Sequence, residues 1–469
     1  MYILHIKAHI CKTKTIVMLH RSLLLLLFCA ATMHLCQAQK VAKASSLKTD
    51  GHPSWLLQSN IYEVNIRQYT QEGTFNAFAK HLDRLRNMGV QTLWFMPINP
   101  ISKVDRKGSL GSYYAVANYT AVNPEFGTMA DWKQLVQSAH NKGFKVIIDW
   151  VPNHTGADHD WLQKKPDFYV KDSLTGKPLS PFDWTDARKL NYQNPELCDS
   201  MIASMEFWLK HTGIDGFRCD VAGEVPDAFW TKCIAQLKKG RNIMMLAEGD
   251  KPELHQSGFD VTYAWADFAM LKLVAKGDRK ANAIDSTLQL LNKTFPKNSL
   301  RMFFTSNHDE NSWNKADYET MPGASHAPFA VLTQTIQRSI PLIYTGQEEP
   351  VLRTIAFFEK DVMEMGKYQR APFYQKLLHL RMRNAALAGN AAMTRINTSN
   401  DAAIYAYART KGNKKIVVFL NFSKQTVSTV VNSFLLKGTA TELFTGKRTT
   451  LAAKQPINLP AWGYLVYEY

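Results

Sequence analysis

Cysteine is scarce in this 469-residue sequence, which contains six. Three of the six lie within the first 36 residues, and the others are Cys198, Cys219 and Cys233. Small disulfide-stapled domains carry a much denser set of cysteines, so the chain is not of that class. A hydrophobic content of 45% is ordinary for a soluble globular protein, and the length predicts two or three domains with a sizeable core.

Long apolar runs are also absent, since no stretch after residue 38 is long and apolar enough to span a bilayer. Residues 1–38 themselves predict a secretory signal peptide. Arg21 precedes a nine-residue apolar run, and the small residues Cys36 and Ala38 fit the −3 and −1 positions of a cleavage site. Leu35 stands where a lipid-attachment motif requires a small residue. We therefore expect export to the periplasm or the extracellular space, without a lipid on Cys36.

The sequence lacks internal repeats, low-complexity segments and any stripe of Lys and Arg with interleaved aromatics. The formal net charge is +16, but four of the basic residues lie in the leader, which has no acidic residue. The other basic residues are scattered, which favours a solvated surface over a nucleic-acid interface. We therefore expect no nucleic-acid partner, and the sequence leaves the oligomeric state open.

From about Trp55 the pattern alternates short β-rich runs with amphipathic segments. Strands are predicted at 61–65, 92–96 and 145–150, and from near residues 216, 244, 261, 301 and 341. Helices are predicted at 75–88, 130–141, 195–211, 227–238, 281–295, 327–338 and 373–383. Eight strands followed by helices predict an α/β fold, a closed (β/α)₈ TIM barrel over residues 53–385. Residues 155–188 show no clear element and predict a small domain inserted after the third strand.

Near Gly389 the pattern changes to short β runs separated by polar turns. These runs cover residues 402–408, 415–421, 426–431, 440–443 and 464–469. They predict a C-terminal antiparallel β-sandwich over residues 389–469.

Polar residues gather where the predicted barrel strands end. They are Asp149, Asn153 and His154 after the third strand, Arg218 and Asp220 on the fourth, Glu248 after the fifth, and His308 and Asp309 after the seventh. Because the strand ends of a barrel meet at one face, these side chains are predicted to share one cleft. Arg218 precedes Asp220 by two residues on an extended segment, so their side chains lie on one face. A guanidinium in that position favours the ionised form of a carboxylate, as a nucleophile requires.

The chain resembles the α-amylase family of glycoside hydrolases (family thirteen) from about Trp55 to the C-terminus. Four segments resemble conserved regions of that family in order: residues 149–154 (DWVPNH), 216–220 (GFRCD), 246–248 (LAE) and 304–309 (FTSNHD). Further segments at 112–116, 123–128 and 341–348 resemble other family stretches. The resemblance implies a secreted, retaining α-glucosidic hydrolase that cleaves α-1,4-glucans or maltooligosaccharides by double displacement.

Roles carried over from the resemblance fall on seven residues. Asp220 would be the nucleophile, Glu248 the general acid, and Asp309 a carboxylate that grips sugar hydroxyls and stabilises the transition state. Arg218 would hold Asp220 ionised, His154 and His308 would bond sugar hydroxyls, and Tyr114 would stack beneath the sugar. Glu248 follows an apolar strand, and its neighbours Gly249 and Asp250 supply no cation. We therefore expect Arg218 to lower the pKa of Asp220, and a nearby Asp250 to favour the protonated form of Glu248.

Several positions depart from the family pattern. Gly223 and Glu224 stand where many starch-cutting relatives have lysine and histidine, and Asn118 replaces an aspartate. Residues 189–191 (KLN) resemble neopullulanase-like and cyclodextrin-cutting members. No cofactor is required for the chemistry. A structural calcium ion is left open, with Asn153 as the candidate ligand, because calcium prefers oxygen ligands.

Three alternatives to α-1,4-glucan hydrolysis follow from the same residues. An α-glucan transglycosylase would use the same carboxylates with a sugar as the acceptor, and a reducing-sugar assay separates it from a hydrolase. A cyclodextrin- or pullulan-cutting enzyme would differ in its products. A non-catalytic carbohydrate-binding homologue would normally lack a catalytic carboxylate, whereas all three are present here. The sequence leaves exo or endo action undecided.

Overall fold

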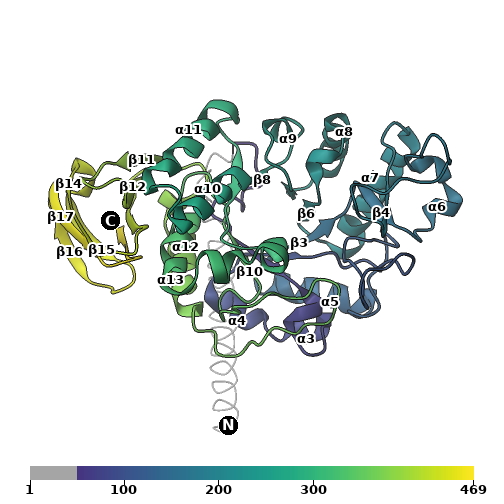
Figure 1. The fold of residues 1–469 in the computed structure, drawn as a ribbon, viewed down its shortest axis with the longest axis horizontal. Helices are drawn as coiled ribbons and strands as arrows, with labels where there is room; N and C mark the ends of the chain where they lie inside the picture. The colour runs from purple at the N-terminus through teal and green to yellow at the C-terminus, as the bar shows by residue number, and fades with distance from the viewer. Residues whose placement is uncertain (1–49) are drawn as a thin grey trace, which may run out of the picture. The chain divides into compact units, whose positions relative to one another are not determined.

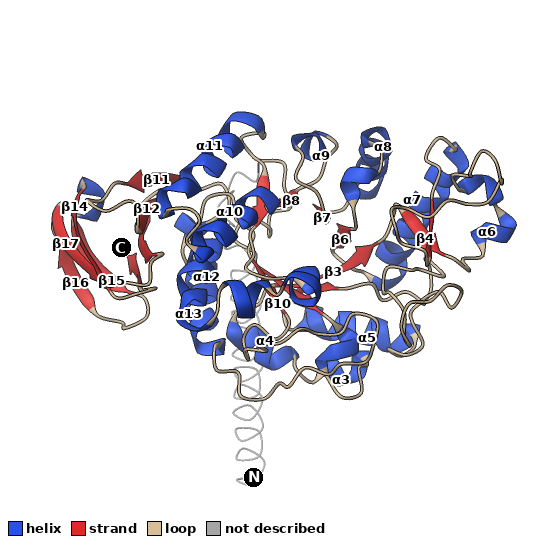
Figure 2. Cartoon of the chain, viewed as in Figure 1, coloured by secondary structure: helices blue, strands red, loops and turns tan. Residues whose placement is uncertain are grey.

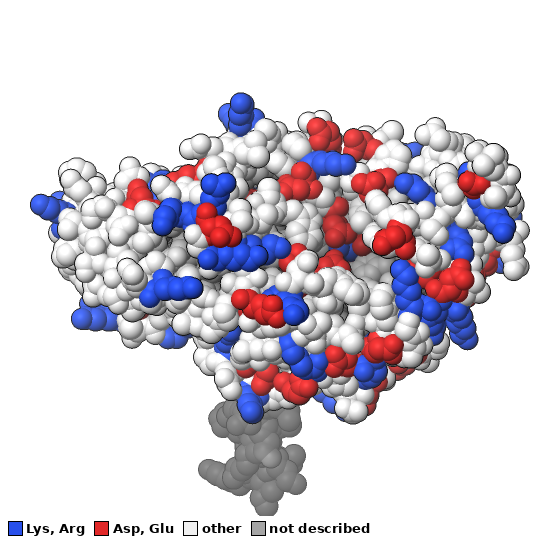
Figure 3. All heavy atoms as spheres, viewed as in Figure 1, with Lys and Arg blue, Asp and Glu red and all other residues white. Residues whose placement is uncertain are grey.

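The computed structural model describes residues 50–469. The signal peptide predicted for residues 1–38 therefore lies outside the described residues. Among residues 50–469, no helix combines the length and apolar character needed to cross a membrane. Cys198, Cys219 and Cys233 are free thiols. On the face of the molecule seen in Figure 3, basic and acidic side chains are interspersed.

Eight parallel strands form the centre of the fold (Figure 1). They are β1 (Ile61–Val64), β2 (Thr92–Phe95), β3 (Lys145–Trp150), β6 (Gly216–Cys219), β7 (Met244–Ala247), β8 (Val261–Tyr263), β9 (Leu300–Met302) and β10 (Leu342–Tyr344). Their order in the sheet is β10-β1-β2-β3-β6-β7-β8-β9. The backbone N–H of Leu342 donates to the carbonyl of Phe303 at 2.9 Å, which brings the two edges together. The sheet is nearly closed, and the predicted TIM-barrel fold is confirmed.

Helices surround the barrel strands (Figure 2). They are α2 (Ile66–Tyr69), α3 (Phe75–Ala79), α4 (Leu82–Met88), α5 (Met129–Asn141), α7 (Pro195–Thr212), α8 (Asp227–Lys238), α9 (Pro252–Gln256), α10 (Trp265–Lys276), α11 (Ile284–Thr294), α12 (His326–Thr335) and α13 (Ala371–Arg383). The single helix predicted at 75–88 is two helices, α3 and α4. The N–H groups of Lys80 and His81 donate to carbonyls three residues back, which tightens the chain and ends α3.

A small inserted segment follows β3. It contains β4 (His154–Gly156), α6 (Trp161–Lys164) and β5 (Ala187–Lys189), and β4 pairs antiparallel with β5. This pairing returns the chain to the barrel at residue 189, opposite His154. The segment was predicted to lack clear elements because its strands and helix are only three or four residues long.

The C-terminal residues form two antiparallel sheets. The larger contains β11 (Ala392–Ile396), β12 (Ile404–Lys411), β13 (Lys414–Asn421), β15 (Gly438–Glu442), β16 (Arg448–Leu451) and β18 (Tyr464–Glu468), and the smaller contains β14 (Val427–Asn432) and β17 (Lys454–Leu459). One apolar cluster includes Phe419 of the larger sheet and Val431 and Ile457 of the smaller. The predicted C-terminal sheet domain is confirmed. Tyr407 on β12 contacts Thr335 of α12 through their hydroxyls at 2.5 Å, which joins this domain to the barrel.

Candidate active site

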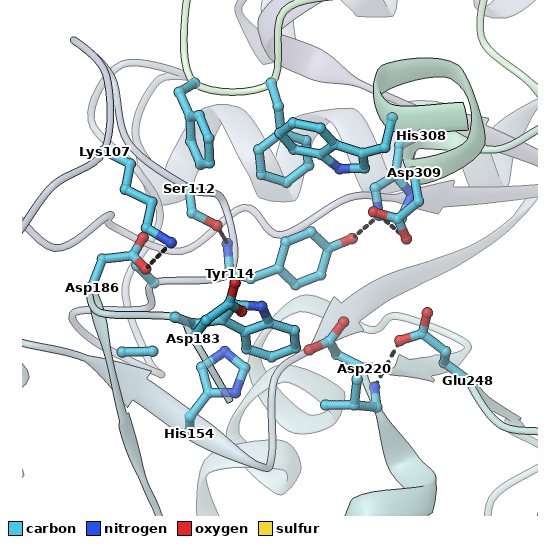
Figure 4. A pocket seen from close by; sticks show the side chains of 17 residues that line it. Lys107, Ser112, Tyr114, His154, Asp183, Asp186, Asp220, Glu248, His308 and Asp309 are labelled. Atoms are coloured by element: carbon cyan, nitrogen blue, oxygen red, sulfur yellow. Dashed lines mark hydrogen bonds and ion pairs between the residues drawn. The ribbon is translucent and has the colours of Figure 1, made fainter. Parts of the chain in front are cut away.

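A cavity of about 430 Å³ lies where the barrel strands end (Figure 4). Six of the seven residues assigned sugar chemistry from the sequence line it, namely Tyr114, His154, Asp220, Glu248, His308 and Asp309. The seventh, Arg218, is fully buried and binds two carboxylates that line the cavity, Asp220 and Glu248. Segments far apart in the sequence therefore meet at one site, as the barrel topology requires.

The backbone around Asp220 is fixed by two tight features. Gly216 begins β6 with φ of +148°, and a Cβ there would lie 2.0 Å from the carbonyl oxygen of Met244 on β7. Val221, directly after Asp220, adopts φ of +35°, which is unfavourable for a β-branched residue. This turn aims the N–H of Val221 at Oε2 of Glu248, at 2.8 Å. The strained backbone of Val221 therefore places Glu248 beside Asp220. Backbone strain of this kind is common at functional sites.

Arg218 is the central cation of the site. Its Nη1 lies 2.9 Å from Oδ1 of Asp220 and 2.9 Å from Oδ1 of Asp149, and its Nη2 lies 3.0 Å from Oε2 of Glu248. Its Nε donates to the hydroxyl of Tyr263 at 3.0 Å. One buried guanidinium therefore orients three carboxylates, which is a task suited to the rigid fork of arginine.

The electrostatics differ from the prediction for Asp220. Burial raises the pKa of Asp220 well above its ordinary value, Glu248 raises it further, and Arg218 lowers it. The predicted effect of Arg218 has the right sign, but burial and the second carboxylate outweigh it.

The surroundings of Glu248 differ from what its sequence neighbours indicate. A cation does reach Glu248, because Arg218 is not reserved for Asp220. Asp250 is engaged elsewhere, since it pairs with Arg301 and accepts a hydrogen bond from the N–H of Ala266 at 2.8 Å. Asp250 is thus committed to Arg301, and Arg218 serves both Asp220 and Glu248.

His308 connects the cavity to a buried glutamate that the sequence analysis missed. Its Nδ1 lies 2.5 Å from Oε1 of Glu63 on β1, and its Nε2 lies 2.8 Å from the hydroxyl of Tyr114 and 3.3 Å from Oδ2 of Asp309. Burial lowers the pKa of His308, but Asp309 and Glu63 outweigh burial and raise it to about 9. His308 is thus a cation near neutral pH, and Glu63 is positioned to keep it so.

Replacing Glu63 with glutamine should move the pH profile of the site. The folded pKa of His308 lies above its ordinary value, so the imidazolium is present at low and neutral pH and is lost as the pH rises through about 9. Glu63→Gln removes one carboxylate, so the alkaline limb of kcat/KM should shift down by about one pH unit. Glu348→Gln is the control, because Glu348 is equally buried but bonds Tyr62 and Arg84 instead. An unchanged alkaline limb in Glu63→Gln would contradict the role of Glu63.

His154 occupies a different environment from His308. Burial lowers its pKa to about 4, so it is a neutral hydrogen-bonding group over the working range of most enzymes. Its ring lies 5.3 Å from that of Trp184, with an edge-on geometry. Trp184 comes from the inserted segment and lines the cavity together with Asp183 and Asp186.

The rim of the cavity contains aromatic residues that no sequence motif indicated. Phe357, in the loop after β10, stacks on Tyr114 with an interplanar angle of 13°. Trp313, on the helical turn η4 (Glu310–Asn314), lies 5.5 Å from Phe357 and is 55% exposed. Tyr114 therefore has support from behind, and the exposed indole extends the apolar surface available to a sugar ring.

The described residues around Asn153 contain no gathering of acidic side chains for the calcium ion left open by the sequence. Asn153 is buried, and its amide Nδ2 lies 3.3 Å from Nδ1 of His154. The oxygen of Asn118 accepts the N–H of Thr120 at 2.8 Å. In the described part of the chain, no three His, Cys, Asp or Glu side chains gather as metal ligands. Calcium takes six to eight oxygen ligands, which include backbone and amide carbonyls as well as carboxylates.

Two family models match the chain. The α-amylase catalytic domain matches residues 48–188 and 179–367. The C-terminal domain of maltogenic amylase matches residues 393–466, which include all of β12 to β17.

Relatives with curated names agree with these matches. An α-amylase from Haloarcula japonica is 27% identical over 401 residues, which cover 80% of this chain and 56% of that protein. Neopullulanase 2 from Thermoactinomyces vulgaris is 30% identical over 396 residues, which cover 76% of this chain and 64% of that protein. The chain thus spans 56% and 64% of the length of these two curated relatives.

Solved structures show the same similarity in three dimensions. A noncanonic maltogenic α-amylase from Thermotoga neapolitana superposes with a TM-score of 0.81 at 26% identity, covering 88% of this chain and 99% of that one. An α-amylase from Lactobacillus plantarum gives a TM-score of 0.78 at 29% identity, with the same coverage. Because the catalytic-domain model matches well over half of its residues, the chain belongs to the α-amylase family.

Proposed function

We propose that the protein is a retaining α-glucosidic hydrolase, exported as its leader predicts, that cleaves α-1,4-linked glucans or maltooligosaccharides. The observation that carries the proposal is the contact of Asp220 and Glu248 with adjacent nitrogens of one guanidinium, inside a cavity that Asp309 also lines. Two carboxyl groups held this close suit direct attack on a sugar, whereas an inverting enzyme needs room for a water molecule between them. The presence of a third carboxylate, Asp309, argues against a homologue that binds carbohydrate without cleaving it.

Asp220 is the proposed nucleophile. Its side chain is 9% exposed and reaches the cavity, while Arg218 holds Oδ1 from the buried side. The other oxygen is left to attack the anomeric carbon and form a glycosyl–enzyme intermediate. Arg218 also stabilises the carboxylate as it regains charge when the intermediate is hydrolysed.

Glu248 is the proposed acid and base. Its Oε2 is held by Arg218 and the N–H of Val221, and its side chain is 14% exposed. Glu248 lines the same cavity as Asp220, so it can give a proton to the leaving oxygen while Asp220 attacks. The same group then removes a proton from the incoming water.

The sugar at the cleavage point would lie between Tyr114 and Asp220. Two histidines form hydrogen bonds with the hydroxyls of this sugar. His308 does so as a cation near neutral pH, and His154 does so as a neutral ring. The side chain of Asp309 is 35% exposed and lies beside the positively charged ring of His308. Its carboxylate accepts hydrogen bonds from the sugar hydroxyls. As positive charge develops on the sugar, this carboxylate stabilises it.

The stereochemistry of the first-formed product tests the proposal. Attack by Asp220 and then by water on the same face inverts the anomeric carbon twice, so an α-glucan should release an α-configured reducing end. Proton NMR of early time points, read before mutarotation, should show the α-anomer in excess. A β-anomer that appears first would contradict the double-displacement mechanism.

A further inference from the structure

The end of the cavity opposite Glu248 is bordered by three chain segments, which we call the end wall: residues 103–112, 183–188 and 357–361. Lys107 and Ser112 of the first, Asp183 and Asp186 of the second, and Phe357 and Phe358 of the third line the cavity. In Figure 4, Lys107 and Asp186 lie on one side of Tyr114, while Asp220 and Glu248 lie on the other. These segments follow different strands, so no sequence motif joins them.

Ion pairs join the first segment of the end wall to the second. Nζ of Lys107 lies 3.6 Å from Oδ1 of Asp186, and Nη2 of Arg188 lies 2.6 Å from Oδ2 of Asp105. A further link to the inserted segment comes from Asp158, whose Oδ2 accepts the N–H of Lys103 at 2.7 Å. The first and second segments are thus linked by two ion pairs, with the cation on the first segment in one and on the second in the other.

Backbone and side-chain bonds join the first segment to the third. The N–H of Ser109 donates to Oε1 of Glu359 at 2.9 Å, and the hydroxyl of Ser109 bonds the same carboxylate. The N–H of Leu110 donates to the carbonyl of Phe358 at 3.0 Å. The end wall is therefore continuous from the inserted segment to the loop after β10.

The direction of the bound chain follows from the proposed function, on which this inference rests. Glu248 protonates the leaving oxygen, so the leaving part of the substrate departs past Glu248. In an α-1,4-glucan the anomeric carbon and the C4 oxygen lie at opposite ends of each ring. The part that remains on Asp220 must therefore extend away from Glu248, toward Lys107 and Asp186.

The chemistry of the pair suits a terminal sugar. The side chain of Asp186 is 6% exposed and that of Lys107 is 34% exposed. Their separation of 3.6 Å is longer than a good hydrogen bond, so each keeps bonding capacity toward the cavity. An ammonium offers three donors and a carboxylate several acceptors, which match the free hydroxyls of a non-reducing end.

We propose that Lys107 and Asp186 close the cleft on the side of the non-reducing end, so that the enzyme acts from chain ends and releases a short product of fixed length. A chain that continued past this point would have to displace the Lys107 side chain and break its ion pair. The pair thereby determines specificity without touching the reacting atoms.

An end-blocked substrate tests this directly. Two aryl maltoheptaosides are compared, one with a free non-reducing end and one whose terminal sugar carries a 4,6-O-ethylidene group. The wild-type enzyme should cleave the blocked compound with less than about a tenth of the kcat/KM for the free one, because the added group meets the end wall. Lys107→Ala should raise the blocked-to-free ratio at least about fivefold by opening that end. Lys103→Ala, an exposed lysine of the same loop, should leave the ratio unchanged.

The outcomes separate the two proposals. Equal cleavage of both compounds by the wild-type enzyme would overturn the closed end while leaving glucan hydrolysis in place. A wild-type preference for the free end that Lys107→Ala does not change would overturn the assignment to this ion pair. If folded wild-type protein cleaves neither compound, the proposed function fails, and this inference fails with it. Lys107 is partly exposed, so its substitution should leave the fold intact.

Discussion

Replacing Asp220 with alanine is expected to lower kcat on maltooligosaccharides by ~10⁴ or more, since removal of a nucleophile eliminates the covalent route. The fold should survive the change. Arg218, which would otherwise be left as an unpaired buried charge, keeps Asp149 and Glu248 as partners. The variant also removes a carboxylate whose burial already raises its pKa, so little stabilisation is lost.

The measurement is kcat on maltoheptaose, with circular dichroism as the check on folding. Asp183→Ala is a matched control, because Asp183 is another carboxylate that lines the cavity but is exposed and lies away from Glu248 (Figure 4). Its kcat should stay within about tenfold of the wild-type value. Activity of Asp220→Ala above about a tenth of wild type would show that another group attacks the sugar.

Most of the fold could be predicted from the sequence because its elements repeat a strong signal. Short β-branched runs alternate with amphipathic helical segments, and each strand with its following helix is one β/α unit of the barrel. Helix α10 was missed for a physical reason. Its sequence is apolar on almost every side, and Phe268, Leu271 and Val274 are buried. A helix without a polar face does not show the period that identifies the others.

In the C-terminal domain, β13 was predicted because most of it is buried, whereas β16 and β17 were missed. Residues 416–421 of β13 are all buried, and Ile416 to Leu420 form a continuous apolar run. β16 and β17 are only four and six residues long, and their exposed residues are Arg448, Thr450, Lys454, Pro456 and Asn458. From their composition alone, such short polar segments resemble turns, because their strand character depends on packing against neighbouring strands.

The site was predictable where a residue follows a strand directly. Asp220, Glu248 and His308 all lie within six residues of a barrel strand, so the position of the strand sets the position of the side chain. Glu63 was missed although it lies on β1, because an acidic residue inside an apolar strand has no neighbour in sequence that reveals its partner. Its partner, His308, is 245 residues away.

The electrostatics and the rim could not be predicted by the same reasoning. Sequence proximity pairs Arg218 with Asp220 alone, whereas the fold brings Asp149 and Glu248 to the same guanidinium. Phe357 lies in the irregular loop after β10 and Trp313 on the short helical turn η4, and neither segment is long enough to show a hydrophobic period. Their approach to Tyr114 depends on the paths of two long loops, which local sequence does not determine.

Replacing Glu248 with glutamine should separate the acid from the nucleophile. The change keeps the shape of the side chain and removes its ability to give up a proton, so kcat on maltoheptaose should fall by about 10³. The loss should depend on the leaving group, because fluoride departs without protonation. With α-maltosyl fluoride, the first turnover should proceed within about tenfold of the wild-type rate.

The measurement is a burst of fluoride. In Glu248→Gln the first step on α-maltosyl fluoride should release one fluoride per enzyme molecule, and later turnovers should be slow because water then lacks its base. Asp220→Ala should show no burst, since it cannot form the intermediate. Glu224→Gln is the isosteric control, because Glu224 is exposed and lies beyond Val221 on the same loop. If Glu248→Gln loses the burst as completely as Asp220→Ala does, then Glu248 does more than transfer a proton. The division of roles between the two carboxylates would then have to be abandoned.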